Sequence, residues 1–263
     1  SYQWLDVTWM YRIFQPMRHA WNLWIGRGAV RWLSQAAYDV VVVTHFFPAD
    51  LCSAGRRAGW LKASLVVVVT DWHPHWFWMA TPCEAMIVNT SEAAAVCERR
   101  GIAQDRIHVV GIPIGKAFTI PQNLDALRQQ LRLTSGRQAI LVTSGGTTVG
   151  QFERVVHSLL ELERRVPGRL QLLVVCGEDE GTRHRLTEAS GRSAMPMQVF
   201  GFVNNMAELM AVSDLIVAKA GGLTINEALA RGVPLVLYHI IPGQERMNAQ
   251  YVSSRGAAVI APH

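Results

Sequence analysis

Ten short runs of valine, isoleucine and leucine, separated by segments with helical spacing, constrain the fold of this chain more than any other feature. The two strongest runs each contain four consecutive valines, which is typical of strands in a parallel sheet covered on both faces. From residue 139 onward strands and helices alternate regularly, which predicts a doubly wound α/β sheet with ligands at the carboxyl ends of its strands. The predicted strands are residues 39–44, 65–70, 85–88, 107–110, 140–143, 171–176, 198–200, 215–217, 234–238 and 257–260.

The chain has 263 residues and is long enough for two domains. A polar stretch around Pro121 follows the fourth predicted strand and marks a domain boundary. We therefore expect residues 1–118 to form one Rossmann-like domain and residues 119–263 a second. Apolar residues recur at helical spacing in residues 2–37, directly after Ser1. Because the first residue is not methionine, we expect the N-terminal domain to be incomplete.

The front of the chain is basic and rich in tryptophan. Residues 1–62 contain seven Arg or Lys against three acidic residues, and all nine tryptophans lie between Trp4 and Trp78. This combination suits a surface resting on anionic lipid headgroups, although tryptophan is also a common core residue. The longest aliphatic stretch is far shorter than the roughly 20 residues that cross a bilayer. The sequence therefore predicts peripheral contact with an anionic membrane surface, and we expect no nucleic-acid partner.

The four cysteines are not arranged as ligands or as a disulfide framework. None of Cys52, Cys83, Cys97 and Cys176 forms a Cys-x-x-Cys pair. We therefore expect neither a zinc site nor disulfides, and a reducing cytoplasm is the default location.

Two glycine-rich turns, residues 144–147 and 220–224, each join an apolar run to a predicted helix, and Glu227 follows the second. Glycine lets the backbone approach a phosphate closely, and a helix that begins there presents free N–H groups to the anion. Glu227 lies one turn into its helix, where its carboxylate can accept hydrogen bonds from ribose hydroxyls. Together the turns predict a clamp for a nucleotide sugar. The alternative is a pair of tight turns with a charge at a helix start.

Two further segments carry polar or aromatic groups suited to such a ligand. Residues 242–248 place four polar side chains on one loop and helix start, which suits sugar hydroxyls but also an ordinary capped surface helix. Residues 200–202, Phe-Gly-Phe, follow a predicted strand and offer backbone groups to a uracil edge, with core packing as the alternative.

The Lys-x-Gly-Gly-x-Thr-x-x-Glu-Ala block that begins at Lys219, the Gly-Val-Pro of residues 232–234 and the Pro-Gly-Gln-Glu-x-x-Asn of residues 242–248 form one set of motifs. Residues 69–76 and 110–114 supply a second set in the first half. The chain resembles, over nearly its whole length, the bacterial processive diacylglycerol glucosyltransferases and the plant-type monogalactosyldiacylglycerol synthases. A more distant likeness is to the peptidoglycan N-acetylglucosaminyltransferase.

This resemblance implies a GT-B fold, in which two Rossmann-like domains face across a cleft, the first holding a lipid acceptor and the second the nucleotide sugar. It also implies an inverting transfer that uses no metal and no cofactor besides the UDP-sugar. The absence of an Asp-x-Asp pair fits phosphates held by backbone amides and helix ends. Relatives begin with a strand and a glycine-rich loop that do not precede Tyr2 here.

The resemblance assigns roles by position. Residues 145–147 would contact the phosphates or the sugar, residues 200–202 the uracil, and residues 221–224 the diphosphate. Glu227 would bind the ribose, and Gln244, Glu245 and Asn248 would bind the hexose. The donor-binding set is Gly145, Gly146, Thr147, Phe200, Gly201, Phe202, Gly221, Gly222, Leu223, Thr224, Glu227, Gln244, Glu245 and Asn248. An inverting reaction needs a base for the acceptor hydroxyl. The candidates are Asp71, His73 and His75, with His45 a weaker one.

Three functional hypotheses follow. The first is transfer of glucose or galactose from a UDP-sugar to diacylglycerol at the cytoplasmic face of the membrane. The second is a UDP-N-acetylglucosamine transferase or epimerase of the same fold. The third is a subunit without catalytic activity that binds donor or anchors to a membrane.

Overall fold

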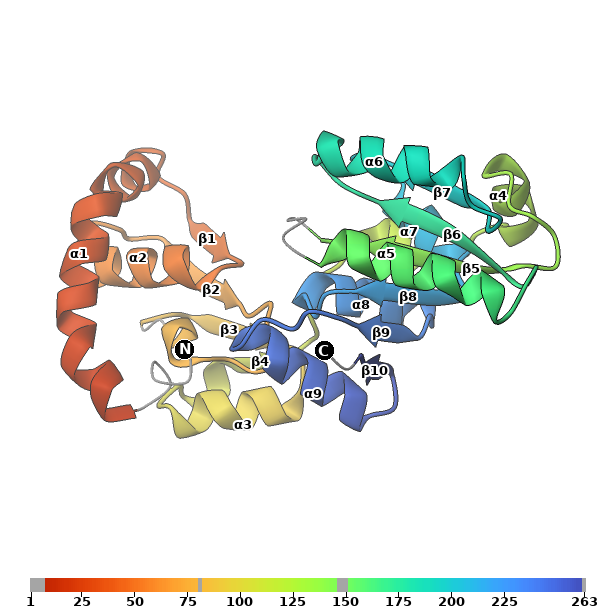
Figure 1. Cartoon of the computed structure of the whole chain (residues 1–263). Coiled ribbons are helices and arrows are strands. Elements are labelled where there is room, and N and C mark those ends of the chain that lie inside the picture. The colour runs from red at the N-terminus through yellow and green to blue at the C-terminus, as the bar shows by residue number, and fades with distance from the viewer. Residues whose placement is uncertain (1–7, 80–81, 146–150, 262–263) are drawn as a thin grey trace. The chain divides into compact units, whose positions relative to one another are not determined.

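The structure is a computed structural model that describes residues 8–79, 82–145 and 151–261. Its chain forms two compact units, each built around its own parallel sheet (Figure 1). Unit 1 comprises Ser1–Pro113 and Pro242–Asn248, and unit 2 comprises Ile114–Ile241 and Ala249–His263. The chain first passes from one unit to the other after Pro113, and the segment from Pro242 returns to unit 1.

Unit 1 contains a four-stranded parallel sheet in the order β1-β2-β3-β4. The order follows the chain, so each crossover advances in the same direction. Since such crossovers are right-handed, their helices lie on one face of the sheet. The elements are α1 (Thr8–Gln35), β1 (Val40–Val43), α2 (Phe46–Arg57), β2 (Ser64–Val68), η2 (Trp76–Trp78), β3 (Ala85–Val88), α3 (Ser91–Arg99), η3 (Gln104–Arg106) and β4 (Ile107–Val109).

The core of unit 1 lies on that helix-covered face. Alternate side chains of the strands, such as Leu65 and Met86, are fully buried and share one cluster with Cys52 of α2 and Cys97 of α3. The opposite face is far more accessible, because Val40 and Val42 of β1 are 50% and 60% exposed. The sheet therefore has one packed face and one open face along β1.

A buried carboxylate of α2 makes polar contacts that hold α1 against α2. Asp50 of α2 accepts hydrogen bonds from Arg18 Nη2 at 2.9 Å and from Asn22 Nδ2, and His19 Nδ1 lies 2.9 Å away. Burial alone would raise the pKa of Asp50, but the His19 hydrogen bond and the Arg18 charge outweigh it and hold the pKa below 3.8. One charged group on α2 thus fixes three polar side chains of the preceding helix.

Unit 2 contains a six-stranded parallel sheet in the order β10-β9-β8-β5-β6-β7. The chain moves outward from β5 to β7, crosses back to β8, and then moves outward on the other side. The elements are η4 (Lys116–Phe118), α4 (Leu124–Gln130), β5 (Gln138–Thr143), α5 (Phe152–Glu161), η5 (Leu162–Arg164), β6 (Leu170–Val175), α6 (Glu180–Ser190), β7 (Met197–Phe200), α7 (Met206–Ala211), β8 (Leu215–Ala218), α8 (Gly222–Arg231), β9 (Leu235–Leu237), β10 (Ala258–Ile260) and α9 (Gln244–Ser254), which belongs to unit 1 as far as Asn248 and to unit 2 from Ala249.

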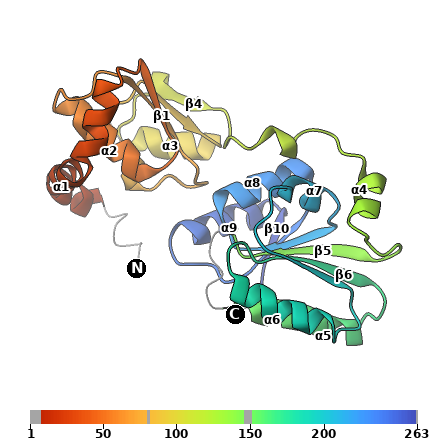
Figure 2. The ribbon, with the colours of Figure 1, turned by 90° about the horizontal axis from the view of Figure 1, so that it is seen from above.

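The reversal of direction covers both faces of the unit 2 sheet. Figure 2 shows α5 and α6 on one side of the central strands and α7 and α8 on the other. The strands are correspondingly buried on both faces: residues 139–143 of β5 and 171–175 of β6 are all buried. The switch point lies between β5 and β8, and a crevice forms at the carboxyl ends of strands that diverge in this way.

All ten predicted strands are present, and their ends lie within two residues of those expected. The segment expected to be helical, residues 2–37, contains α1 from Thr8 to Gln35. The continuous valine runs correctly predicted parallel strands, but full coverage of both faces holds for β5 and β6 and not for β1.

Candidate functional site

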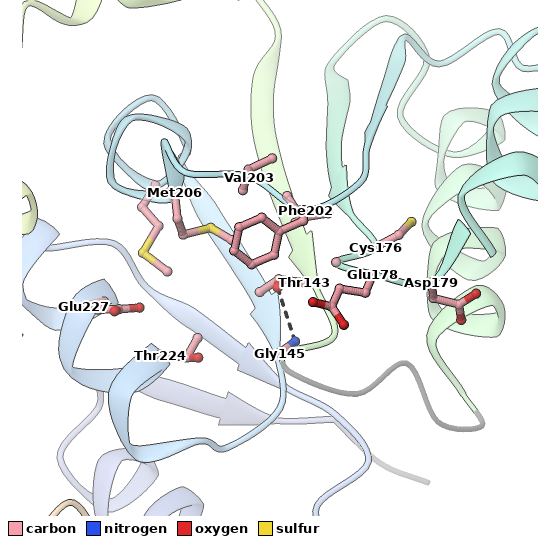
Figure 3. Close-up of a pocket in the computed structure, with 13 residues that line it drawn as sticks. Thr143, Gly145, Cys176, Glu178, Asp179, Phe202, Val203, Met206, Thr224 and Glu227 are labelled. Atoms are coloured by element: carbon pink, nitrogen blue, oxygen red, sulfur yellow. Dashed lines mark hydrogen bonds between the residues drawn. The ribbon is translucent and has the colours of Figure 1, made fainter. Parts of the chain in front are cut away.

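A pocket of about 570 Å³ opens at the carboxyl edge of the unit 2 sheet (Figure 3). It lies where the ends of β5 and β6 meet the start of α8, at the switch point of the sheet. This is the expected position of a ligand site in a doubly wound fold. Its lining consists of Thr143, Gly145, Val175, Cys176, Gly177, Glu178, Asp179, Phe202, Val203, Met206, Met210, Thr224 and Glu227.

Two glycines form the floor of the pocket. Gly145 follows β5 with φ of +68° and Gly177 follows β6 with φ of +61°, a conformation that other residues rarely adopt. A Cβ on Gly177 would lie 3.9 Å from the Gly145 carbonyl oxygen, so the two turns run side by side. Gly145 N also donates to Thr143 Oγ1 at 3.3 Å (Figure 3). The floor is therefore backbone, accessible to a bulky anionic ligand.

One wall of the pocket is the beginning of α8. Gly221 is the N-cap of this helix, and Thr224 and Glu227 both face the pocket (Figure 3). Glu227 is half-buried, and burial raises the pKa of its carboxyl. The free N–H groups at the helix start suit an anion, while a carboxylate one turn further along suits hydroxyl groups.

The opposite part of the pocket is apolar and follows β7. It is formed by Phe202, Val203, Met206 and Met210, and Phe202 is 70% exposed. An exposed aromatic ring beside flexible methionines suits a flat ring of a ligand. The pocket thus offers an apolar platform, a glycine floor and a polar wall in succession.

The structure brings together four of the predicted donor residues: Gly145, Phe202, Thr224 and Glu227 line the pocket. Other predicted residues lie in the adjoining turns: Phe200 ends β7, Gly201 follows it, and Gly221, Gly222 and Leu223 begin α8. The predicted Gly146 and Thr147 lie outside the described residues.

The sequence analysis did not find the contribution of β6. Gly177 and the neighbouring Glu178 and Asp179 line the pocket, and Asp179 also caps α6 by accepting from Thr182 N at 2.9 Å. The signal was present, since Cys176-Gly177 ends a predicted strand adjacent to the first glycine turn. Adjacency of β5 and β6 is a property of the sheet order, which a local sequence motif does not encode.

A second constellation lies in unit 1 around Asp71, which follows β2. Asp71 Oδ2 accepts from Trp78 Nε1 at 2.7 Å and from Gln244 Nε2 at 2.6 Å. Burial raises the pKa of this carboxyl to about 6, even though the Trp78 hydrogen bond lowers it. Both donors use the same oxygen, and no other residue that the structure describes donates to Oδ1. The group is a carboxylate of unusual basicity with one oxygen available.

The segment predicted to bind hexose, residues 242–248, belongs to unit 1 by its contacts. Gln244 bonds to Asp71, Glu245 lies in the first turn of α9, and Asn248 Oδ1 accepts from Trp72 N at 3.0 Å. The structure therefore brings the predicted hexose segment and one predicted base together, although 173 positions separate Gln244 from Asp71 along the chain.

The candidate histidines surround η2. His75 is the N-cap of this helix, and burial, with the nearby Arg100 and Arg18 charges, lowers its pKa to about 3. His73 is half-buried two residues earlier. His75 Nδ1 accepts from Phe77 N at 3.1 Å, so this nitrogen is occupied and the ring stays neutral. The geometry favours Asp71 over His75 for accepting a proton.

Within the described ranges, no group of three or more His, Cys, Asp or Glu side chains is placed to hold a metal ion. The four cysteines are buried free thiols, and burial raises the pKa of Cys176, at the pocket, to about 11. No described helix is long and apolar enough to cross a membrane.

Both halves of the chain match glycosyltransferase families. Residues 139–262 match the glycosyltransferase family 28 C-terminal domain, and residues 14–114 match monogalactosyldiacylglycerol (MGDG) synthase. The chain is similar to the diacylglycerol glycosyltransferases. A processive diacylglycerol beta-glucosyltransferase of Bacillus cereus (strain AH187) is 30% identical over 250 residues, which are 95% of this chain and 63% of the relative. That of Bacillus thuringiensis (strain Al Hakam) has the same identity and coverage. The chain thus spans less than two thirds of the length of these relatives.

Solved structures show the fold. Acinetobacter baumannii MurG has a TM-score of 0.60 at 17% identity, covering 91% of this chain and 64% of MurG. Staphylococcus aureus MnaA with UDP has a TM-score of 0.63 at 13% identity, covering 89% of this chain and 72% of MnaA. Anabaena HepE with UDP and glucose has a TM-score of 0.53 at 18% identity, covering 86% of this chain and 66% of HepE. The predicted α/β GT-B class and the predicted family resemblance are confirmed.

Proposed function

We propose that this chain carries the donor site and part of the acceptor site of an enzyme that transfers glucose or galactose from a UDP-sugar to diacylglycerol. The observation that carries this proposal is the unit 2 pocket, in which a glycine floor, a helix start and Glu227 converge at the switch point of the sheet. The lipid acceptor is proposed from the relatives, which are named diacylglycerol glucosyltransferases.

In the pocket, each part of the donor has a chemical counterpart. The uracil would pack on Phe202, with its edge toward the backbone that follows β7. The ribose hydroxyls would donate to Glu227, and the diphosphate would lie over Gly145 and the N-terminus of α8. Since backbone N–H groups and a helix end would meet the phosphate charge, we propose that the transfer needs no metal and no further cofactor.

Asp71 is proposed as the base. The acceptor hydroxyl oxygen would attack the anomeric carbon from the side opposite the UDP, forming the new C–O bond as the bond to UDP breaks and the configuration inverts. The hydroxyl proton would pass to Asp71 Oδ1. A carboxyl with a pKa of about 6 is ionised at neutral pH and is a stronger base than an ordinary carboxylate. Gln244, bonded to Oδ2, would connect the base with the hexose segment.

The lipid acceptor requires contact with a membrane, and α1 offers a surface for it. Trp21, Trp24 and Trp32 of this helix are each about 60% exposed, and the exposed Arg27 and Arg31 lie among them. Indole rings at the interface and guanidinium groups on phosphates are the usual elements of peripheral binding to anionic bilayers. We place the complete protein on the cytoplasmic face of the cell membrane.

The test is calorimetric titration with UDP, UDP-glucose, UDP-galactose and UDP-N-acetylglucosamine. We expect UDP to bind, with a preference for one UDP-hexose. Glu227→Ala should weaken UDP binding by about 1–3 kcal/mol, the contribution of charge-assisted hydrogen bonds. The matched control is Glu188→Ala, an exposed glutamate of α6 away from the pocket.

Hexose transfer to diacylglycerol is then measured with the complete protein. Preference for UDP-N-acetylglucosamine, or indifference to lipid, would favour a different transferase or an epimerase. UDP binding without any transfer would favour a subunit that only binds the donor. Unchanged UDP affinity in Glu227→Ala would remove this residue from the donor site.

A further inference from the structure

Two histidines at the carboxyl edge of the unit 1 sheet are held in the same way. His45 follows β1 and caps α2, with its Nδ1 accepting from Phe47 N at 3.2 Å. His75 follows β2 and caps η2, with its Nδ1 accepting from Phe77 N at 3.1 Å. Both imidazoles thus use the same ring nitrogen to satisfy a backbone N–H at a helix start.

The capping bond fixes where the ring proton lies. A nitrogen that accepts a hydrogen bond carries no proton, so in a neutral imidazole the proton must lie on the other nitrogen. While the caps are intact, His45 and His75 each present Nε2–H, a donor. Neither Nε2 can accept a proton from a substrate in this state.

The same two aromatic side chains lie near both imidazole rings. Phe46 lies against both, with ring centroids 4.2 Å from His45 and 5.0 Å from His75, and Trp78 lies 6.5 Å and 6.2 Å from the same two rings. Trp78 also donates to Asp71, which connects this cluster with the proposed base. The result is a pair of oriented donors among aromatic rings, one of which is hydrogen-bonded to the proposed base.

The nearby cations are engaged elsewhere. Arg18 bonds to Asp50, and Arg100 Nη1 donates to the Pro74 carbonyl at 2.7 Å while its guanidinium packs over Trp76. The neutral His75 ring offers an N–H group flanked by apolar rings, and the capping His45 presents its N–H beside the same Phe46. This combination suits a neutral acceptor such as a carbonyl oxygen carried by an apolar molecule more than it suits a phosphate.

We propose that His45 and His75 bind the lipid acceptor by donating hydrogen bonds from Nε2 to its ester carbonyl oxygens, so that the enzyme selects ester-linked over ether-linked diradylglycerols. This inference rests on the proposed function, because it names the part of the acceptor that unit 1 recognises. A 1,2-diacylglycerol carries two ester carbonyls next to its free hydroxyl. Two fixed donors, linked to Asp71 through Trp78, match that arrangement, and the aromatic rings would cover the glycerol and the first acyl carbons.

The test compares dioleoylglycerol with its dialkyl ether analogue, which keeps the hydroxyl and both chains but lacks the carbonyls. One neutral hydrogen bond contributes about 1 kcal/mol, or about fivefold. We therefore expect the complete wild-type protein to favour the ester by about 25-fold in kcat/KM. Equal use of the two lipids would overturn the proposal while leaving the proposed function standing.

Substitutions separate the donor from the cap. Asparagine places its oxygen where Nδ1 lies and keeps the cap, but its amide does not reach the position of Nε2. His75→Asn and His45→Asn should each lower the ester preference about fivefold, and the double variant should abolish it, with thermal unfolding unchanged. His75→Gln, whose Nε2 reaches further, should keep most of the preference. His108→Asn on β4 is the matched control, since His108 is exposed.

Retention of the full ester preference in the double variant would overturn the proposal. A loss of activity that is equal for both lipids would also overturn it, because that pattern indicates a structural role for the caps. If the wild-type protein binds UDP-glucose but transfers to neither lipid, the diacylglycerol acceptor itself is wrong and this inference falls with it.

Discussion

The sheets of the two units differ in how they are covered. In unit 2 the chain reverses direction at β8, so helices cover both faces and residues 139–143 of β5 are buried without exception. In unit 1 the strand order follows the chain, α2 and α3 pack on one face, and Val40 and Val42 of β1 remain 50% and 60% exposed on the other. Both sheets are built from equally apolar runs. Strand order, rather than strand composition, sets the coverage.

The unit 2 pocket and the group of side chains around Asp71 in unit 1 also differ in the chemistry that they suit. Unit 2 supplies a pocket made mostly of backbone turns and apolar side chains, which suits binding. Unit 1 supplies a buried carboxylate, capped histidines and aromatic rings, which suits chemistry and acceptor recognition. Binding of donor and transfer of hexose should therefore be separable by substitution.

The largest expected effect is on transfer. Asp71→Asn should lower kcat by about 10²–10⁴-fold, because the base is lost, and leave the affinity of unit 2 for UDP unchanged. In the wild-type protein kcat/KM should fall as pH drops below about 6, the pKa of Asp71. Because burial raises this pKa above its unfolded value of 3.8, the folded protein loses stability as pH rises between the two values. Asp71→Asn should therefore melt higher than wild type at pH 8.

Asp39→Asn, at an exposed carboxylate before β1, is the matched control and should change neither kcat nor the affinity for UDP. Substantial transfer by Asp71→Asn at pH 8, measured with the complete protein, would exclude Asp71 as the base. Weakened UDP binding in the same variant would contradict the separation between the units.

The next effect is on the stability of unit 1 alone. Asp50→Ala leaves Arg18, His19 and Asn22 without their common partner and should cost about 3–5 kcal/mol of unfolding free energy. All nine tryptophans lie between Trp4 and Trp78, so tryptophan fluorescence during urea unfolding reports on unit 1. UDP binding should survive. Asp105→Ala, at an exposed aspartate of unit 1, is the control. Identical unfolding curves for the two variants would show that Asp50 does not stabilise the packing of α1 on α2.

A smaller effect measures the difference in coverage directly. Val142 of β5 is fully buried, whereas Val42 of β1 is 60% exposed. Val142→Ala should lower stability by about 2 kcal/mol, from lost burial and the cavity left behind, while Val42→Ala should change it by less than about 0.5 kcal/mol. Hydrogen exchange of the two strands is the measurement. Similar losses at both positions would mean that the β1 face is covered in solution.

The smallest effect concerns the membrane. Arg27→Gln and Arg31→Gln should each weaken binding to vesicles containing phosphatidylserine by about 1 kcal/mol, and added salt should weaken wild-type binding similarly. Arg164→Gln, a highly exposed arginine of unit 2, is the control and should have no effect. Cosedimentation with vesicles measures the binding of wild type and of the three variants. Equal binding of wild type to neutral and anionic vesicles would contradict an electrostatic contribution from α1.

Much of the fold was predictable from the sequence because each strand has a local signal. The valine runs of β1 and β2 and the apolar run of β5 are continuous, and each is bounded by polar residues or glycine. The turn at Gly145 was predicted because two consecutive glycines follow an apolar run, and the positive φ of Gly145 explains why glycine stands there. Gly177 has the same conformation but is followed by Glu178 and Asp179 rather than by a second glycine, so no motif marked it.

The sequence by itself determined the parallel strands, the glycine turn after β5, the start of α8 and the position of Glu227 within it, because backbone conformation and helical periodicity are local. Only the tertiary structure decided that Gln244 meets Asp71, that Gly177 lies beside Gly145, and that one sheet is covered on both faces. These features depend on which strands become neighbours. Strand order is set by the packing of the whole unit, to which residues far apart in the chain contribute together.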